Sequence, residues 1–105
     1  MEKLYVMIIE KGASYNNVNK AVIERHVAHM KTLDDNGNLM LCGPLTGYSG
    51  VAGMVILQAQ SFEEADSFCK VEPLVTEGYA TYKLSTLQVA NKENDYLLHR
   101  TADHH

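Results

Sequence analysis

The stretch AVIERHVAHMKTLDDNGNLMLCGPL (21–45) predicts a helix, a stop and a strand in direct succession. Apolar residues recur at helical spacing from about Asn17 to Asn36, which indicates the main helix of the protein. They are Val18, Val22, Ile23, Val27, Met30 and Leu33. Asn36-Gly37 is typical of a helix C-terminus, and LMLCGPL (39–45) is typical of a strand that enters a Gly-Pro turn.

Strands flank this stretch on both sides. KLYVMIIE (3–10) is apolar and rich in β-branched and aromatic residues, so we expect a first strand in a central position. VAGMVILQAQ (51–60) predicts another strand, which we expect to pair antiparallel with residues 39–45.

A second helix is predicted over SFEEADSFCK (61–70), because Ser61 followed by Glu64 matches a capping box. Its inward residues should be Phe62, Ala65, Phe68 and Cys69. Pro73 either ends this helix or begins a short turn of its own.

A last strand follows Gly78, because polar and apolar residues alternate from Tyr79 to about Val89. The order β-α-β-β-α-β predicts an α+β, ferredoxin-like fold with both helices on one face of an antiparallel sheet. We assign residues 1–90 to one domain. Residues 91–105 form a polar C-terminal arm that is either a short helix or frayed.

One face of such a sheet has no helix to cover it. The strand 51–60 carries largely uncharged side chains on both faces, with Met54, Ile56 and Gln58 on one and Val55, Leu57 and Ala59 on the other. A bare sheet with two such faces favours a homodimer that packs sheet against sheet.

Composition excludes several classes of function. The chain has 105 residues, 46% of them hydrophobic, with a formal charge of -4 and a pI near 5.6, so it has no basic surface for nucleic acid or anionic membranes. No apolar run approaches the roughly 20 residues of a membrane span, and the start resembles no secretion signal, so we expect a cytoplasmic protein. The two cysteines, Cys42 and Cys69, are expected to be buried free thiols.

His26 lies in the middle of the apolar stripe of the main helix, with Val22 and Met30 about 40° to either side. One interpretation is a neutral core histidine that is hydrogen-bonded to the backbone. The other is a general base or acid, oriented by a carboxylate beside a cavity. Glu72 is the candidate carboxylate, because Pro73 restricts its backbone to extended conformations. His29 lies at the edge of the stripe, where it could reach solvent.

Two other chemistries are less well supported by the spacing. His26 and His29 are three residues apart, whereas paired helical metal ligands are more often four apart, and no third ligand is evident, so we expect no metal. Cys42 could pair with His26 as a nucleophile, but its apolar strand favours a packing role. Tyr48 and Ser49, in the loop TGYSG, are candidate donors to a developing oxyanion.

The run HVAHMKTLDDNGNLMLCGPL, the Gly-rich loop and strand, SFEEA, and EPLVTEGY before the closing strand together resemble the YCII-related (YciI-like) family of dimeric α+β barrels. The resemblance spans about residues 3–89. It implies that His26 and Glu72 form a dyad that lines a pocket, with Gly43 and Pro44 in a turn near the same cleft. Glu72 stands where the family usually has aspartate, and Ile23 where it often has arginine.

The resemblance also implies a cofactor-free lyase or isomerase, because known enzymes of this family and fold move protons on small ring acids or phenols. The expected function is therefore proton transfer, as in a dehydrochlorinase or isomerase, on a small cyclic or carbonyl-bearing metabolite. Two alternatives stay open: a dimeric module that binds a small metabolite without catalysis, and an accessory subunit whose pocket is vestigial.

Overall fold

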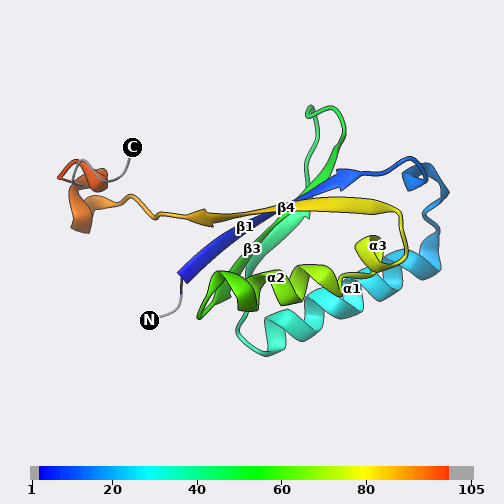
Figure 1. Ribbon diagram of the computed structural model, residues 1–105, viewed down its shortest axis with the longest axis horizontal. Helices are drawn as coiled ribbons and strands as arrows, with labels where there is room; N and C mark the ends of the chain where they lie inside the picture. Colours follow the sequence, from blue (N-terminus) through cyan, green and yellow to red (C-terminus); the bar gives the residue numbers. More distant parts are fainter. Residues whose placement is uncertain (1–2, 100–105) are drawn as a thin grey trace.

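The computed structural model describes residues 3–99, and its helices and strands follow the predicted β-α-β-β-α-β order (Figure 1). In chain order they are β1 (Lys3–Lys11), a 3₁₀ helix (Tyr15–Asn17), α1 (Lys20–Asp35), β2 (Leu39–Pro44), β3 (Val51–Ala59), α2 (Phe62–Lys70), α3 (Pro73–Thr76), β4 (Ala80–Leu87) and a second 3₁₀ helix (Lys92–Leu97). Residues 100–105 of the expected arm lie outside the described residues.

The four strands form one antiparallel sheet in the order β2-β3-β1-β4. β1 lies between β3 and β4, so the expected central position of the first strand is confirmed. β2 and β3 pair antiparallel, also as expected, with Cys42 opposite Val55 and Pro44 opposite Gly53. β2 therefore forms one edge of the sheet and β4 the other. The fold is α+β with a ferredoxin-like arrangement.

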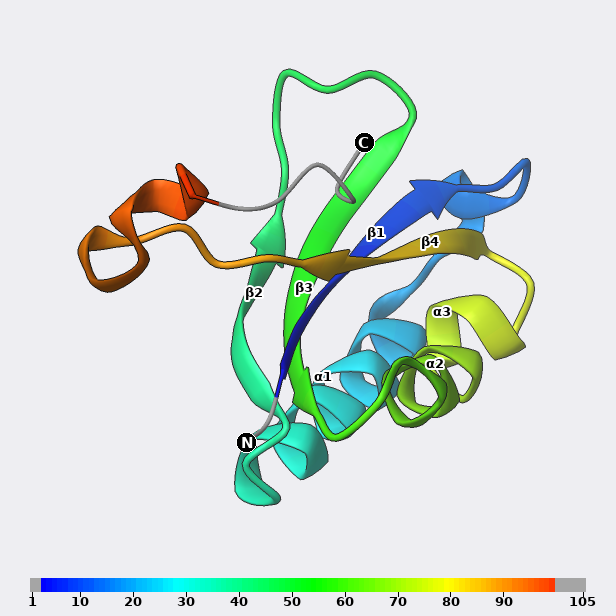
Figure 2. The ribbon, with the colours of Figure 1, turned by 60° about the vertical axis from the view of Figure 1, so that its left-hand side comes forward.

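All three helices lie on one face of the sheet (Figure 2). The core lies between these two layers and is formed by alternate residues of β1 and β3 and by one side of each helix. Its most enclosed members are Tyr5, Met7 and Ile9 of β1, Val55, Leu57 and Ala59 of β3, Val22, Met30 and Leu33 of α1, Ala65 and Cys69 of α2, and Leu74 of α3. Burial of this much apolar surface is the main force that holds the helices on the sheet.

Helix α1 begins later than predicted and ends where predicted. Asn19 is its N-cap, because its side chain accepts a hydrogen bond from Val22 N at 3.1 Å. The preceding residues Tyr15–Asn17 form a separate 3₁₀ helix, so the expected start near Asn17 is wrong by three residues. Gly37 ends the helix with a φ of 77°, a left-handed conformation that glycine adopts without steric strain.

Helices α2 and α3 are fixed by local capping. Ser61 Oγ accepts from Glu64 N at 3.1 Å, as the capping box predicts, but the Glu64 carboxylate turns back to Gln60 N. Phe62 is 41% exposed rather than inward, although its ring packs edge-on against Tyr5. Pro73 begins the separate short helix α3, the second of the two expected outcomes.

The sheet face opposite the helices is largely apolar. Residues that alternate with the core positions of β1 and β3 point to this face: Leu4, Val6, Ile8, Met54 and Ile56. The flanking strands add Leu41 and Leu87 to it, at 52% and 40% exposure. Within the described residues, no helix or strand covers this face (Figures 1 and 2).

The described part of the C-terminal arm extends away from the body of the protein (Figure 1). Asn91 and Asn94 cap its 3₁₀ helix reciprocally, and Tyr96 and Leu98 are 67% and 71% exposed. No helix of residues 3–99 is both long and apolar enough to cross a membrane.

Candidate active site

A cleft of about 520 Å³ opens between one flank of α1 and strands β2 and β3. Its walls are mainly apolar. The α1 wall includes Ile23, Val27 and Met30, and the strand wall is formed by residues 42–44 and 52–55. Tyr15 lines the cleft from the preceding 3₁₀ helix, and Lys31 and Asp34 add charged side chains. The volume lies in the range of about 300–1,000 Å³ typical of small-molecule sites.

His26 lies on the α1 wall of this cleft and contacts Glu72 on its other side. The ring Nδ1 forms a hydrogen bond with Glu72 Oε1. The side chain of His26 is 22% exposed and that of Glu72 is fully buried, so the imidazole stands between the cleft and the carboxylate. The structure therefore brings together the two residues that the sequence placed in a dyad.

Glu72 is held by its own backbone and by the start of α3. Its conformation is extended (φ -64°, ψ 127°), as expected for a residue before proline. Its second oxygen, Oε2, accepts from Leu74 N at 2.7 Å and so caps α3. Both carboxylate oxygens thus have a partner, which a buried charge requires. Glu72 is therefore not a solvated loop carboxylate.

This arrangement determines the role of each imidazole nitrogen. An ionised carboxylate only accepts hydrogen bonds, so with Glu72 ionised Nδ1 of His26 would carry the proton that points to it. Nε2 then has a free lone pair and can accept a proton. A positive charge formed on the ring by that transfer lies directly beside the buried Glu72 carboxylate, which stabilises it.

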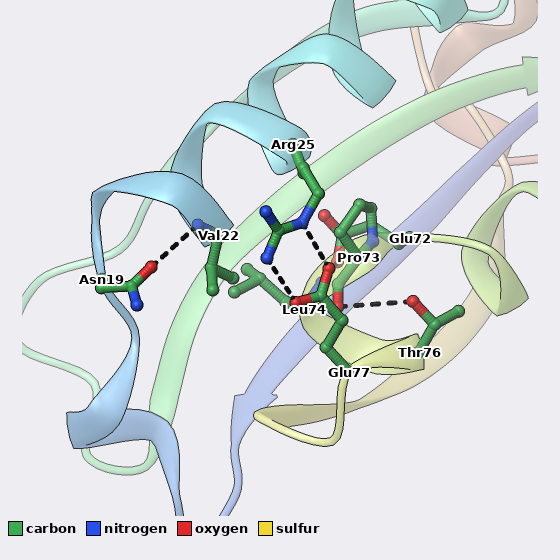
Figure 3. A network of polar contacts seen from close by, with 8 residues as sticks. All are labelled: Asn19, Val22, Arg25, Glu72, Pro73, Leu74, Thr76 and Glu77. Carbon is green, nitrogen blue, oxygen red and sulfur yellow. Dashed lines mark hydrogen bonds and ion pairs between the residues drawn. The ribbon is translucent and has the colours of Figure 1, made fainter.

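A second side-chain bridge joins the same two elements (Figure 3). Arg25 donates from Nε to Glu77 Oε2 and from Nη2 to Glu77 Oε1, each at 2.7 Å. These hydrogen bonds lower the pKa of Glu77 and raise that of Arg25. This pair is not evident from the sequence, because its members are 52 residues apart and match no motif.

The remaining predicted site residues are divided between the cleft and the surface. Gly43 and Pro44 line the cleft, as the resemblance implied. Tyr48 and Ser49 do not: both lie in the exposed loop between β2 and β3, with Tyr48 63% exposed, and the structure does not bring them beside His26. Their predicted role as oxyanion donors has no support from this arrangement.

The two cysteines differ in environment. Cys69 is buried, as expected, and burial raises the pKa of its thiol to about 12. Cys42 is exposed and lines the cleft, so its expected burial is wrong. The physical reason is that β2 is an edge strand, flanked on one side only.

His29 reaches less far toward solvent than expected, because its Nε2 lies 3.0 Å from the Phe68 carbonyl oxygen.

The positions of the charged cleft residues were also missed. Lys31 falls on the polar side of the helical stripe in sequence and Asp34 falls between Ile23 and Val27, and the cleft includes both. Among residues 3–99, no three His, Cys, Asp or Glu side chains are grouped so that they could hold a metal ion.

Comparisons with known proteins agree with this architecture. A family model of the YCII-related domain matches residues 3–88. A similar solved structure is 5-chloro-2-hydroxyhydroquinone dehydrochlorinase from Burkholderia phenoliruptrix, in complex with 2,5-dihydroxybenzoquinone. It has 19% sequence identity and a TM-score of 0.69, and the likeness covers 88% of this chain and 99% of that one. A search of curated proteins found no match.

Proposed function

This chain belongs to the YCII-related domain family, and from that premise we propose that it is a lyase-like or isomerase-like enzyme that works without a cofactor. In this proposal His26 transfers protons to and from a small cyclic or carbonyl-bearing metabolite, and Glu72 orients the imidazole. The observation that carries the proposal is the contact of His26 Nδ1 with a fully buried carboxylate, on the wall of an apolar cleft.

The chemistry begins with removal of a proton from a substrate O–H or C–H by His26 Nε2. In an elimination, the released electron pair forms a double bond and the leaving group departs with its own electron pair. For a chlorinated ring phenol, the imidazolium first returns the proton to the chlorine-bearing carbon, which makes that carbon tetrahedral. Removal of a second hydroxyl proton then forms the new double bond as chloride leaves, and the sum is loss of HCl. In an isomerisation, the imidazolium returns the proton to a different carbon. A positioned base of this kind contributes typically about 10²–10⁴-fold to the rate.

The proposed substrate class follows from the walls of the cleft. Ile23, Val27 and Met30 present apolar surface to one side of a bound molecule, and the backbone of β2 and β3 at Gly43 and Gly53 faces the other. Two such walls suit a flat ring. The similar dehydrochlorinase was solved with a dihydroxybenzoquinone, and we extend that class of small oxygenated ring to this chain as part of the proposal.

The test uses 5-chloro-2-hydroxyhydroquinone and a set of small cyclic ketones and phenols as probes. Chloride release measures elimination, and deuterium uptake from D₂O into substrate carbon, followed by NMR, measures proton transfer without elimination. We expect His26→Asn to lose about 10²-fold or more in either rate. The matched control is His29→Asn, on the same helix, which should retain activity. A His26→Asn variant with unchanged rates would refute the proposal.

A binding module without catalysis is the alternative outcome. In that case a probe would bind tightly and be recovered chemically unchanged. His26→Asn would then weaken binding of the probe without affecting any reaction. The apolar cleft supports binding in either case.

We also propose that the chain forms a homodimer through the apolar face of the sheet. Val6, Ile8 and Ile56 lie at the centre of that face, and no described element covers them. Sheets that pack face to face bury side chains of this kind between them. Sedimentation should give a dimer for the wild type and a monomer for Val6→Lys. A matched control is Ala28→Lys, at an exposed position of α1 on the other side of the molecule, which should leave the dimer intact.

A further inference from the structure

We propose that Arg25 and Glu77 are positioning residues, which hold α3 against α1 so that Glu72 stays bonded to His26. The catalytic consequence rests on the proposed function, whereas the effect on the His26 ring does not. The two bridges connect the same pair of elements. His26 and Arg25 are neighbours on α1, and their partners Glu72 and Glu77 lie at the two ends of α3.

The short helix α3 needs such a tether. It has four residues, about one turn, and an isolated helix of that length is not stable in water. Leu74 anchors its middle in the core at 3% exposure, and Tyr79 N donates to Leu74 O at 2.9 Å. Leu74 and the partly buried Val75 fix the middle of the turn and still leave a small rotation about that point. Contacts at both ends, through Glu72 and Glu77, remove that rotation.

The geometry of the Arg25–Glu77 bridge suits this role. A guanidinium that binds both oxygens of a carboxylate fixes the direction of approach as well as the distance. Both N···O distances are 2.7 Å, at the short end for such pairs. The side chains are 52% and 31% exposed, so the bridge contributes little to overall stability but still defines orientation. Figure 3 shows Arg25 reaching from α1 to Glu77, with Glu72 at the start of the same short helix.

An effect on His26 follows from a loss of this bridge. If α3 rotates, the Glu72 carboxylate moves relative to Nδ1, and the proton on the ring is no longer confined to that nitrogen. The free lone pair at Nε2, which the proposed base requires, is then present in only part of the molecules. A displacement of 1 Å at a reacting group can reduce a rate by about 10²-fold. Because Leu74 limits the rotation of α3, the displacement of Glu72 is smaller, and the rate should fall by roughly tenfold.

The experiment is NMR of ¹⁵N-histidine-labelled full-length protein, in which the ring nitrogen shifts report the tautomer of His26. We expect one tautomer, protonated at Nδ1, in the wild type. Glu77→Gln and Arg25→Met should each give a mixture of tautomers. Arg25→Lys keeps the charge but not the bidentate contact, and should give an intermediate result.

Two further variants make the result specific. The exchanged pair, Arg25→Glu with Glu77→Arg, should restore the single tautomer, which a simple loss of surface charge would not explain. Lys83→Met removes another exposed ion pair, with Glu10 at 3.5 Å on the sheet, and should leave His26 unchanged. The variants should all fold, because exposed pairs contribute little to stability.

An unchanged tautomer in folded Glu77→Gln and Arg25→Met would overturn the positioning role. The same variants should reduce the deuterium-exchange rate of a turned-over probe by roughly tenfold, with a smaller change in its binding. If the wild type turns over no probe, the proposed function fails, and the tautomer measurement still decides whether the bridge positions His26.

Discussion

Substitution of Glu72 should separate the stability of the fold from the chemistry of the site. Glu72→Gln keeps the shape of the side chain and an oxygen that can accept from Leu74 N. Its amide NH₂ replaces the oxygen that faces His26 Nδ1. Because an amide NH₂ only donates, Nδ1 must become the acceptor and the ring proton moves to Nε2. The nitrogen that faces the cleft then donates instead of accepting.

The magnitudes follow from burial and contacts. The carboxylate is fully buried and accepts two hydrogen bonds, from Leu74 N and from the His26 ring. Glu72→Ala removes one partner of a buried pair and should reduce the free energy of unfolding by about 3–5 kcal/mol. Glu72→Gln retains both contacts in altered form and should reduce it by about 1–2 kcal/mol. Its rate of proton transfer should nevertheless fall by about 10²–10⁴-fold, the full contribution of a positioned base.

Urea denaturation followed by circular dichroism measures the first quantity, and deuterium exchange into a probe measures the second. If Glu72 orients His26, the Gln variant should be clearly more stable than the Ala variant and still nearly inactive. A Gln variant with wild-type exchange rates would refute the role of Glu72 as the group that orients His26. An Ala variant as stable as the wild type would refute the estimate for the buried pair.

Three further predictions concern the cleft, the thiols and the pH dependence. Gly53→Ala should lower the free energy of unfolding by about 1–3 kcal/mol and weaken probe binding, because a Cβ there would lie 2.8 Å from the Gly43 carbonyl oxygen. Thermal melting measures the loss of stability, and titration of the protein with the probe measures the loss of binding. Iodoacetamide should alkylate Cys42 in the native protein and Cys69 only after unfolding, as mass spectrometry of digested protein would show, since burial raises the pKa of Cys69 to about 12. The pKa of Glu77 is lowered from 4.5 by its arginine partner, so the stabilisation from that bridge is present above pH 4.5 and is lost as pH falls through the lower folded-state value. Melting temperatures of wild type and Glu77→Gln should therefore converge in acid and differ near neutral pH.

The order of the elements and the family were predictable from the sequence. Periodicity alone distinguishes the helical stripe of α1 from the alternation of β4, and the resemblance over residues 3–89 agrees with a family match over residues 3–88. The contact of Glu72 with His26 was one of two interpretations that the residues left open, and the family resemblance implied it; the structure brings the two side chains together.

What the sequence could not provide depends on long-range geometry. The apolar character of Cys42 and its neighbours predicts a strand, but only the order β2-β3-β1-β4 shows that this strand is at an edge. Similarly, Ile23 and Val27 belong to the apolar pattern that indicates the main helix, yet each is 41% exposed and lines the cleft. Hydrophobic spacing does not distinguish a wall of a cleft from a wall of the core. The loop position of Tyr48 likewise says nothing about its distance from His26.

The cleft opens at the side of the fold, between a helix flank and an edge strand, rather than within the packed interior. The outer part of its helical wall, formed by Ile23 and Val27, therefore consists of side chains whose replacement removes little interior contact. Substitutions at Ile23 and Val27 can reshape the bound molecule's surroundings while the fold keeps its melting temperature. A lineage that carries this scaffold is thus free to acquire new substrates by single amino-acid changes, and a laboratory selection that randomises these two codons should recover well-folded variants at high frequency.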